Sequence, residues 1–228
     1  MSAYTLEIKL LSDTAFSMGA GVSGVVDSEI QHDEHGLPTL SGRAIKGLLV
    51  NECSEILYAL GQTENGDWHD AAQGLFGSRG DLEEESSVYF GDAGIAPDLA
   101  ACLSGESGLT RQDILDALTD IRRQTAMSEK GAPEDESLRS IRVLIRGITL
   151  YAPIRFMKKL GKKEKALLAA CVLSLRRAGL GRTRGKGKLE ATITDCPLDP
   201  KEFAACDLGS ITDLSIAWFE DFKTEVAQ

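Results

Sequence analysis

Two helix-forming segments, each preceded by a strand-forming segment, restrict the fold more than any other feature of this sequence. Residues 42–60 (GRAIKGLLVNECSEILYAL) follow Ser41, a predicted N-cap, and place apolar side chains on one face. Residues 162–179 (KKEKALLAACVLSLRRAG) predict a second helix that stops at Gly179. Strands are predicted at residues 4–12, 86–92, 139–156 and 188–196. This order predicts an α+β fold with helices on one side of an antiparallel sheet, as in a ferredoxin-like or RNA-recognition-like core.

The 228 residues suit one large domain, so residues 1–228 are treated as a single unit. Residues 13–38 predict a long loop. In residues 61–110 we predict an irregular acidic insertion whose one regular element is the short strand at residues 86–92. A third helix is predicted over residues 110–124, with Thr110 as its cap. Residues 128–137 predict a polar tip, and the last thirty residues are acidic and weakly helical.

Composition excludes several classes of protein. Apolar runs fall short of the roughly 18 residues that cross a membrane, and the first residues lack a secretory signal pattern. The five cysteines stand singly, without a CxxC pair, which argues against a zinc site and for free thiols. We therefore expect a cytoplasmic protein without a membrane partner.

Charge is distributed unevenly along the chain. The net charge is −10, yet residues 139–188 hold 15 basic residues and one acidic residue, Glu164, a balance of +14. The rest of the chain has 10 basic and 34 acidic residues, or −24. A polyanion responds to the local field rather than to the total, so nucleic-acid binding stays open. The alternative is that the chain's own acidic segments neutralise this basic segment.

The segment GLGRTRGKGKLE, residues 179–190, concentrates this charge among glycines. Glycine allows a positive φ and a close approach to a ligand, and the basic side chains suit a phosphate backbone. A solvated turn between a helix and a strand is the alternative. The spacing differs from that of a nucleotide-binding phosphate loop and the segment precedes a strand, which argues against nucleotide hydrolysis.

Two other motifs carry little weight. GAGVSG, residues 19–24, matches the dinucleotide fingerprint, but a loop rather than a helix is predicted after it. HDEH, residues 32–35, places four potential ligands in a row, and neighbouring side chains diverge.

Asp27 lies in a glycine-rich loop ahead of the capped helix, where a carboxylate beside bound phosphate could hold a metal or position a 2′-hydroxyl. From the residues alone, a plain surface aspartate is the favoured interpretation.

Three stretches together resemble one family. They are GVVDSEIQHDEHGLPTLSGRAIKGLL (residues 24–49), RRQTAMSEKGAPEDESLRSIRVLIRGITLYAPI (residues 122–154) and GLGRTRGKGKLE (residues 179–190). In this order they resemble the RAMP superfamily of CRISPR–Cas proteins, and within it the backbone subunit of type III effector complexes. The resemblance spans roughly residues 4–192.

The resemblance implies a ferredoxin-like palm with a thumb β-hairpin near residues 123–146, centred on residues 127–138. It implies that the chain binds a CRISPR guide RNA and a target RNA. It also implies assembly with further copies of itself or related RAMP subunits and with the large type III subunit. Asp27, ahead of the Gly-Leu-Pro turn, matches the aspartate that supports cleavage of target RNA with Mg²⁺ or another divalent metal.

The resemblance and the basic charge together assign RNA binding to ten residues: Ser41, Arg43, Lys46, Arg122, Arg123, Arg139, Arg182, Arg184, Lys186 and Lys188. The leading hypothesis is a guide-binding backbone subunit that is a metal-dependent endoribonuclease. The first alternative is a scaffold that binds RNA without cutting it. The second is a nuclease that processes guides alone, for which His32 and His35 are the nearby bases.

Overall fold

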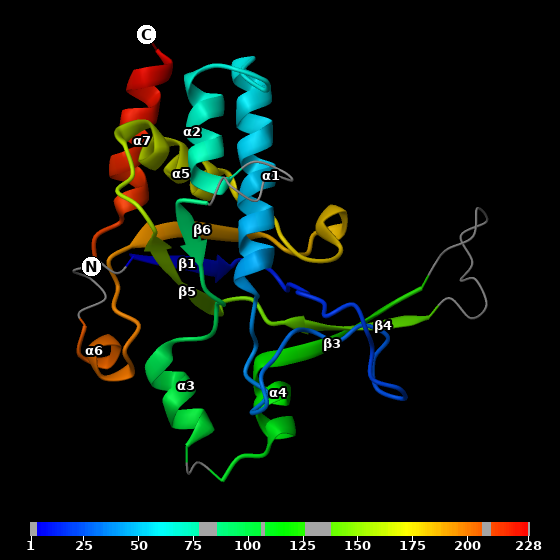
Figure 1. The fold of residues 1–228 in the computed structure, drawn as a ribbon. Coiled ribbons are helices and arrows are strands. Elements are labelled where there is room, and N and C mark those ends of the chain that lie inside the picture. The colour runs from blue at the N-terminus through cyan, green and yellow to red at the C-terminus, as the bar shows by residue number, and fades with distance from the viewer. Residues whose placement is uncertain (1–3, 78–85, 106–107, 126–137, 207–210, 228) are drawn as a thin grey trace, which may run out of the picture.

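The structure is a computed structural model that describes residues 4–77, 86–105, 108–125, 138–206 and 211–227. Figure 1 shows a central sheet with helices above and below it and a long hairpin at its side. In chain order the elements are β1 (Tyr4–Leu10), α1 (Gly42–Leu60), α2 (Asp67–Phe76), β2 (Val88–Phe90), α3 (Pro97–Ser104), α4 (Arg111–Leu118), β3 (Thr119–Gln124), β4 (Arg139–Leu144), β5 (Thr149–Phe156), α5 (Lys162–Ser174), the 3-10 turn η1 (Arg182–Arg184), β6 (Leu189–Thr194), α6 (Pro200–Ala205) and α7 (Leu214–Val226).

The central sheet has the strand order β2-β5-β1-β6, and each neighbouring pair is antiparallel. Helix α1 lies between β1 and β2 in the chain, and α5 lies between β5 and β6. A split β-α-β unit repeated in this way is the ferredoxin-like arrangement. The predicted α+β, ferredoxin-like fold is therefore confirmed, and we call this sheet with α1 and α5 the palm.

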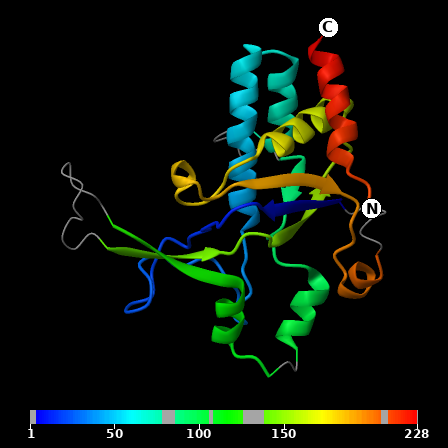
Figure 2. The same cartoon turned by 180° about the vertical axis from the view of Figure 1, so that it is seen from behind.

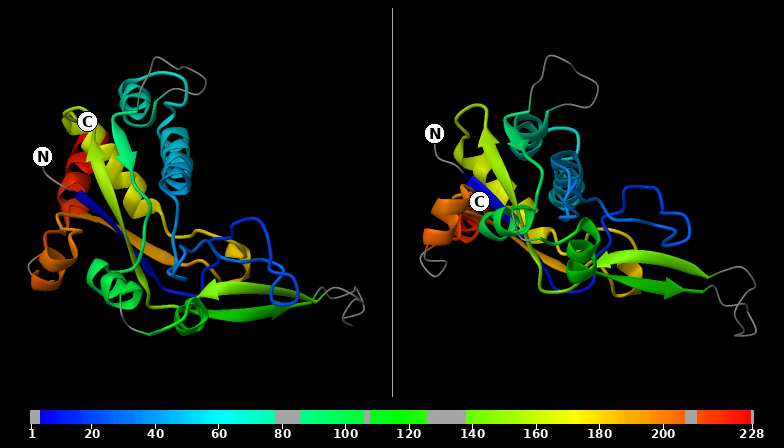
Figure 3. Two further views of the ribbon diagram at one scale, coloured as in Figure 1. Left: turned by 60° about the horizontal axis from the view of Figure 1, so that its bottom comes forward. Right: turned by 90° about the horizontal axis from the view of Figure 1, so that it is seen from below.

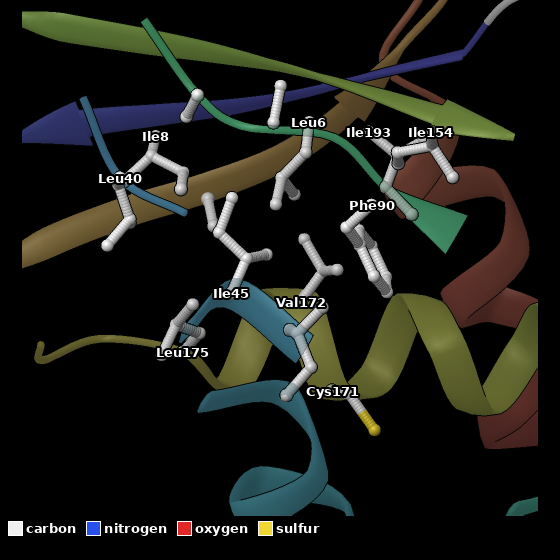
Figure 4. Close-up of a cluster of buried hydrophobic side chains, with 14 of the residues drawn as sticks. Leu6, Ile8, Leu40, Ile45, Phe90, Ile154, Cys171, Val172, Leu175 and Ile193 are labelled. Carbon is white, nitrogen blue, oxygen red and sulfur yellow. The ribbon is translucent and has the colours of Figure 1, made fainter. Parts of the chain in front are cut away.

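The core of the palm lies between the sheet and its two helices (Figure 4). Leu6 and Ile8 of β1 alternate with more exposed residues, so one face of the strand is apolar and buried. Ile45 of α1 and Val172 of α5 meet this face. The residues 166–172 of α5 are buried throughout, because the sheet, α1, α2 and α7 all pack around this helix.

The other face of the sheet is covered in part. Phe203 of α6 packs edge-on against Tyr151 of β5, with ring centroids 5.1 Å apart. Tyr151 alternates along β5 with the buried Leu150 and Ala152, which places it on the face away from the core. The prediction that helices lie on one side of the sheet therefore holds for α1 and α5 and fails for α6. No helix in the described part of the chain has the length and apolarity needed to cross a membrane.

A second sheet consists of β3 and β4, which pair from Thr119 opposite Leu144 to Gln124 opposite Arg139. These two strands form a β-hairpin at the place where the thumb hairpin is predicted, near residues 123–146, and residues 126–137 between them lie outside the described residues. The prediction of a helix over residues 110–124 is wrong beyond Leu118. Residues 119–124 pair with β4 instead, because a strand partner distant in sequence outweighs local helix propensity.

Three other predicted boundaries differ. The single strand predicted at residues 139–156 is two strands, β4 and β5, separated by a turn in which Gly147 has φ 92°. The region 61–110 is not irregular, since it contains α2 and α3, and Trp68 and Leu75 of α2 are buried. Helix α5 ends at Ser174 rather than at Gly179, because Leu175 is extended (ψ 93°) and the next residues bond to the chain at the start of β6: Ala178 N–H donates to Gly187 O, and Leu189 N–H donates to Arg176 O.

The first loop, which we define as residues 11–40, runs along β4 as an irregular third strand. Thr14 N–H donates to Leu144 O at 3.0 Å, and Arg142 N–H donates to Ser28 O at 3.0 Å. The bridge between Ser28 and Ile141 is parallel. Figures 2 and 3 show this loop and the hairpin side by side at one end of the palm.

A buried ion pair closes the contact between the first loop and β4. Arg142 and Glu29 are each 3% exposed, and Arg142 Nε lies 3.0 Å from Glu29 Oε1. Arg142 also donates to the Thr119 hydroxyl at 3.0 Å and reaches Asp116 Oδ1 at 3.4 Å. One guanidinium therefore joins the first loop, α4 and both strands of the hairpin.

We predict that Arg142→Ala lowers the free energy of unfolding by about 3–5 kcal/mol, because Glu29 stays buried without its partner. The exposed Arg155→Ala on β5 is the matched control and should change the free energy by less than about 0.5 kcal/mol. Urea unfolding followed by circular dichroism measures both values. A loss for Arg142→Ala as small as that of the control would contradict this role of the ion pair.

Candidate nucleic-acid interface

The glycine-rich segment forms a rigid loop rather than a loose turn. Its 3-10 turn, Arg182–Arg184, lies between Gly181 and Gly185, which have φ values of 74° and 81°. Gly187 has φ 73°, and a Cβ added there would lie 2.1 Å from Ala178 O, so only glycine fits. The glycine content is thus explained by backbone packing, which fixes where the basic side chains project.

The first loop holds this glycine-rich loop in place. Leu180 N–H donates to Ala15 O at 3.0 Å, and Gly187 N–H donates to Asp13 O at 2.9 Å. Arg184 Nη1 donates to Gln124 Oε1 on β3 at 2.8 Å. The glycine-rich loop, β3 and the beginning of the first loop, which are far apart in sequence, therefore meet at one end of the palm.

A cavity of ≈ 450 Å³ opens where they meet, and we call it the cation pocket. Its charged lining consists of four basic side chains and one carboxylate: Arg122, Arg146, Arg184, Lys186 and Asp13. The remaining lining residues are Leu11, Ser12 and Gly185. The excess of positive charge in a concave surface favours an anionic ligand.

The one carboxylate that lines the cation pocket, that of Asp13, forms an ion pair with Arg122. Asp13 Oδ2 lies 2.7 Å from Arg122 Nη2, and Asp120 pairs with Arg122 Nη1 at 2.6 Å. Asp13 Oδ1 also accepts the Arg146 backbone N–H at 3.4 Å, but among the described residues no carboxylate oxygen lies within 4.0 Å of the Arg146 guanidinium or the Lys186 ammonium. Partial burial, and then the nearby Arg122, lower the pKa of the Lys186 ammonium. An anion in the cation pocket would relieve this repulsion.

The start of α1 lies close to the glycine-rich loop. Ser41 is the N-cap, as predicted, and its Oγ accepts a hydrogen bond from Ala44 N–H at 3.3 Å. A groove of ≈ 430 Å³ is lined from α1 by Ala44, Gly47, Leu48 and Asn51 and on the other side by Gly179 and Leu180. The α1 residues assigned to RNA binding, Arg43 and Lys46, belong to this first part of the helix, where Arg43 is exposed and Lys46 is half-buried.

Part of the basic segment is neutralised within the chain. On α5, Lys162 lies 3.3 Å from Asp221 of α7, and Lys163 pairs with Asp67 of α2. The alternative stated for the +14 segment thus holds for α5. It does not hold for Arg182, Arg184 and Lys188 of the glycine-rich loop, which are exposed and form no ion pair within 4.0 Å among the described residues.

Asp27 occupies a separate position, in the part of the first loop that lies against the edge of β4. Its side chain is exposed, and Oδ2 accepts hydrogen bonds from Ser140 N–H at 2.6 Å and from Ser140 Oγ at 2.9 Å. These two bonds, and then the charge of Arg139, hold the pKa of the Asp27 carboxyl below its usual value. Asp27 is therefore an ionised, oriented carboxylate beside Ser140, near the end of β4 that leads to the hairpin tip.

The hairpin separates Asp27 from the cation pocket. Successive side chains of a strand point to opposite faces. Arg122 and Gln124 of β3 therefore lie on one face of the hairpin, and Arg123 lies on the other. Arg122 lines the cation pocket, whereas Arg123 pairs with Ser140, the residue that binds Asp27. The predicted RNA-binding residues thus divide between two faces.

The residues around Asp27 could hold a divalent metal only through a single carboxylate. No group of three or more His, Cys, Asp or Glu side chains lies close enough to share an ion in the described ranges. Mg²⁺ is often held by one or two carboxylates together with waters and substrate phosphates. Asp27 can supply one such oxygen, because Ser140 engages Oδ2 and leaves Oδ1 for a ligand.

Sequence reasoning missed four residues of this interface: Asp13, Gln124, Ser140 and Arg146. The basic character of residues 139–188 could have pointed to Arg146, but the other three act through partners distant in sequence. The histidines proposed for a processing nuclease lie elsewhere. His32 Nε2 contacts Arg111 Nη2 at 3.1 Å, and His35 lies 3.6 Å from Glu34.

Comparisons with known proteins agree with this architecture. No curated protein matches the sequence. A chain of the type III-B Cmr-beta complex bound to cognate target RNA is 15% identical, with a TM-score of 0.62 over 84% of this chain and 96% of that chain. A chain of the type III-B Cmr-beta complex in its apo state is 16% identical, with a TM-score of 0.58 over 83% of this chain and 96% of that chain. At these identities the likeness shows the fold alone. A sequence model of the RAMP superfamily matches residues 7–190, and the chain therefore belongs to the RAMP superfamily.

Proposed function

We propose that this protein is a guide-RNA-binding backbone subunit of a type III CRISPR effector complex. The observation that carries the proposal is the cation pocket, which gathers Arg122, Arg146, Arg184 and Lys186 beside the first loop. The family assignment supports it, as does the similarity to chains of type III-B complexes, one of them bound to target RNA. Further copies, related RAMP subunits and the large type III subunit are the proposed protein partners.

The proposed path of the guide RNA follows the positive charge. Phosphates would enter the cation pocket and continue past Arg182 and Lys188 to the start of α1. There, Arg43 and Lys46 supply the positive charge, since the Asp92 carboxylate already accepts the Gly42 N–H at 2.8 Å and Ser41 Oγ accepts the Ala44 N–H. Arg184 suits this role best, because Gln124 holds its side chain at the rim of the cation pocket.

We further propose that Asp27 supports cleavage of a target RNA on the other face of the hairpin. Mg²⁺ or another divalent metal, when bound, would supply a Lewis acid that activates the nucleophile and neutralises developing charge. Asp27 would hold the metal through one carboxylate oxygen. Arg123, which pairs with Ser140 on this face of the hairpin, would stabilise negative charge on the phosphate under attack.

A non-catalytic scaffold is the second candidate, and one observation favours it. Both hydrogen bonds from Ser140 to Asp27 tie the first loop to β4, which is a structural role that needs no chemistry. The two candidates differ in whether RNA is cut, so they share every prediction about binding and differ only at Asp27.

We predict that Arg184→Ala weakens binding of single-stranded guide RNA and lowers the magnitude of the slope of log K against log salt by about 0.7, the share of one phosphate contact. Fluorescence anisotropy across a salt series measures both quantities. Lys201→Ala on α6, an exposed lysine remote from the cation pocket, is the matched control. If Arg184→Ala and the control bind alike at every salt concentration, the cation pocket does not contact the phosphate backbone.

We also predict that Asp27→Ala abolishes target cleavage and leaves guide and target binding intact, because the carboxylate lies on the face away from the cation pocket. The measurement is a single-turnover cleavage time course with the assembled complex, paired with affinity measurements. A chelator should reproduce the loss in the unmodified complex. Cleavage by Asp27→Ala at the unmodified rate would instead establish the scaffold.

A further inference from the structure

One residue of β4, Ser140, determines how the carboxylate of Asp27 is oriented. Its backbone N–H and its hydroxyl both donate to Asp27 Oδ2, at 2.6 and 2.9 Å. In return, Asp27 N–H donates to Ser140 O at 2.9 Å. The two residues therefore exchange hydrogen bonds through backbone and side chain alike, although they lie 113 positions apart in sequence.

The structure that supports Ser140 is more deeply buried than the part of the first loop that carries Asp27. Arg142 and Glu29, which follow Ser140 and Asp27 by two residues each, form the buried ion pair. On the loop side, Val22, Val25 and Asp27 are exposed, so little besides β4 restrains this carboxylate. A carboxylate on an exposed loop samples several rotamers unless a fixed partner selects one.

We propose that Ser140 is a positioning residue: it holds Oδ2 of Asp27 so that Oδ1 is presented to the RNA. The inference rests on the proposed cleavage function. The Ser140 hydroxyl is the separable part of this contact, because its removal leaves the backbone N–H bond and the pairing of β4 in place. Ser140 would touch neither RNA nor metal, and its effect would pass through Asp27.

The test compares Ser140→Ala, which removes the hydroxyl, with Ser140→Thr, which retains it on a residue suited to a strand. Ser23→Ala, exposed in the same first loop, is the matched control. Each variant is assembled into the complex with guide RNA. Single-turnover cleavage at saturating complex and target affinity are measured side by side.

For Ser140→Ala we expect the cleavage rate to fall about tenfold or more, as for the loss of a hydrogen bond to a charged group, with target affinity unchanged. Ser140→Thr should recover most of the rate, and Ser23→Ala should cut normally. Hydrogen exchange supplies a readout that does not depend on cleavage. In Asp27→Ala, the Ser140 amide should exchange faster than in the unmodified protein.

Two results would overturn the inference while leaving the proposed function standing: Ser140→Ala cuts at the unmodified rate although Asp27→Ala is inactive, or Ser140→Thr fails to recover the rate. Unchanged exchange at the Ser140 amide in Asp27→Ala would also overturn it. Normal cleavage by Asp27→Ala is a different outcome, because it removes the proposed cleavage function itself.

Discussion

The buried ion pair between Arg142 and Glu29 is the interaction on which the functional end of this molecule depends. Burying two charges costs free energy that their attraction repays only when the geometry is good, so such a pair favours one arrangement over others. Here it fixes the first loop against β4, and Arg142 extends the contact to Thr119 and Asp116. The hairpin, the first loop and α4 consequently behave as one unit.

The hairpin in this unit has two chemically different faces. On one, the first loop holds the glycine-rich loop so that Arg184 and Lys186 share a pocket with Arg122. On the other, Ser140 holds the ionised carboxylate of Asp27. Because β4 lies between them, binding of a polyanion and chemistry on a phosphate can be assigned to different residues.

Local signals were sufficient to predict much of the fold. The cap at Ser41 and the apolar spacing that follows it located α1, and alternation located β1 and β6. The site depended on contacts that no local pattern contains, such as Glu29 with Arg142 and Asp13 with Arg122, which lie 113 and 109 residues apart. Residues 119–124 were misassigned for the same reason, since their strand exists only through β4.

The central claim is that one face of the hairpin binds the guide RNA and the other face contacts the target RNA. Site-specific photocrosslinking tests this claim most directly. A photoreactive amino acid would replace the exposed Thr183 of η1 in one protein and the exposed Val25 of the first loop in another. Each is assembled with guide and target RNAs that carry different fluorophores. The account predicts crosslinks from position 183 to the guide and from position 25 to the target. Crosslinks from both positions to the same strand would contradict it.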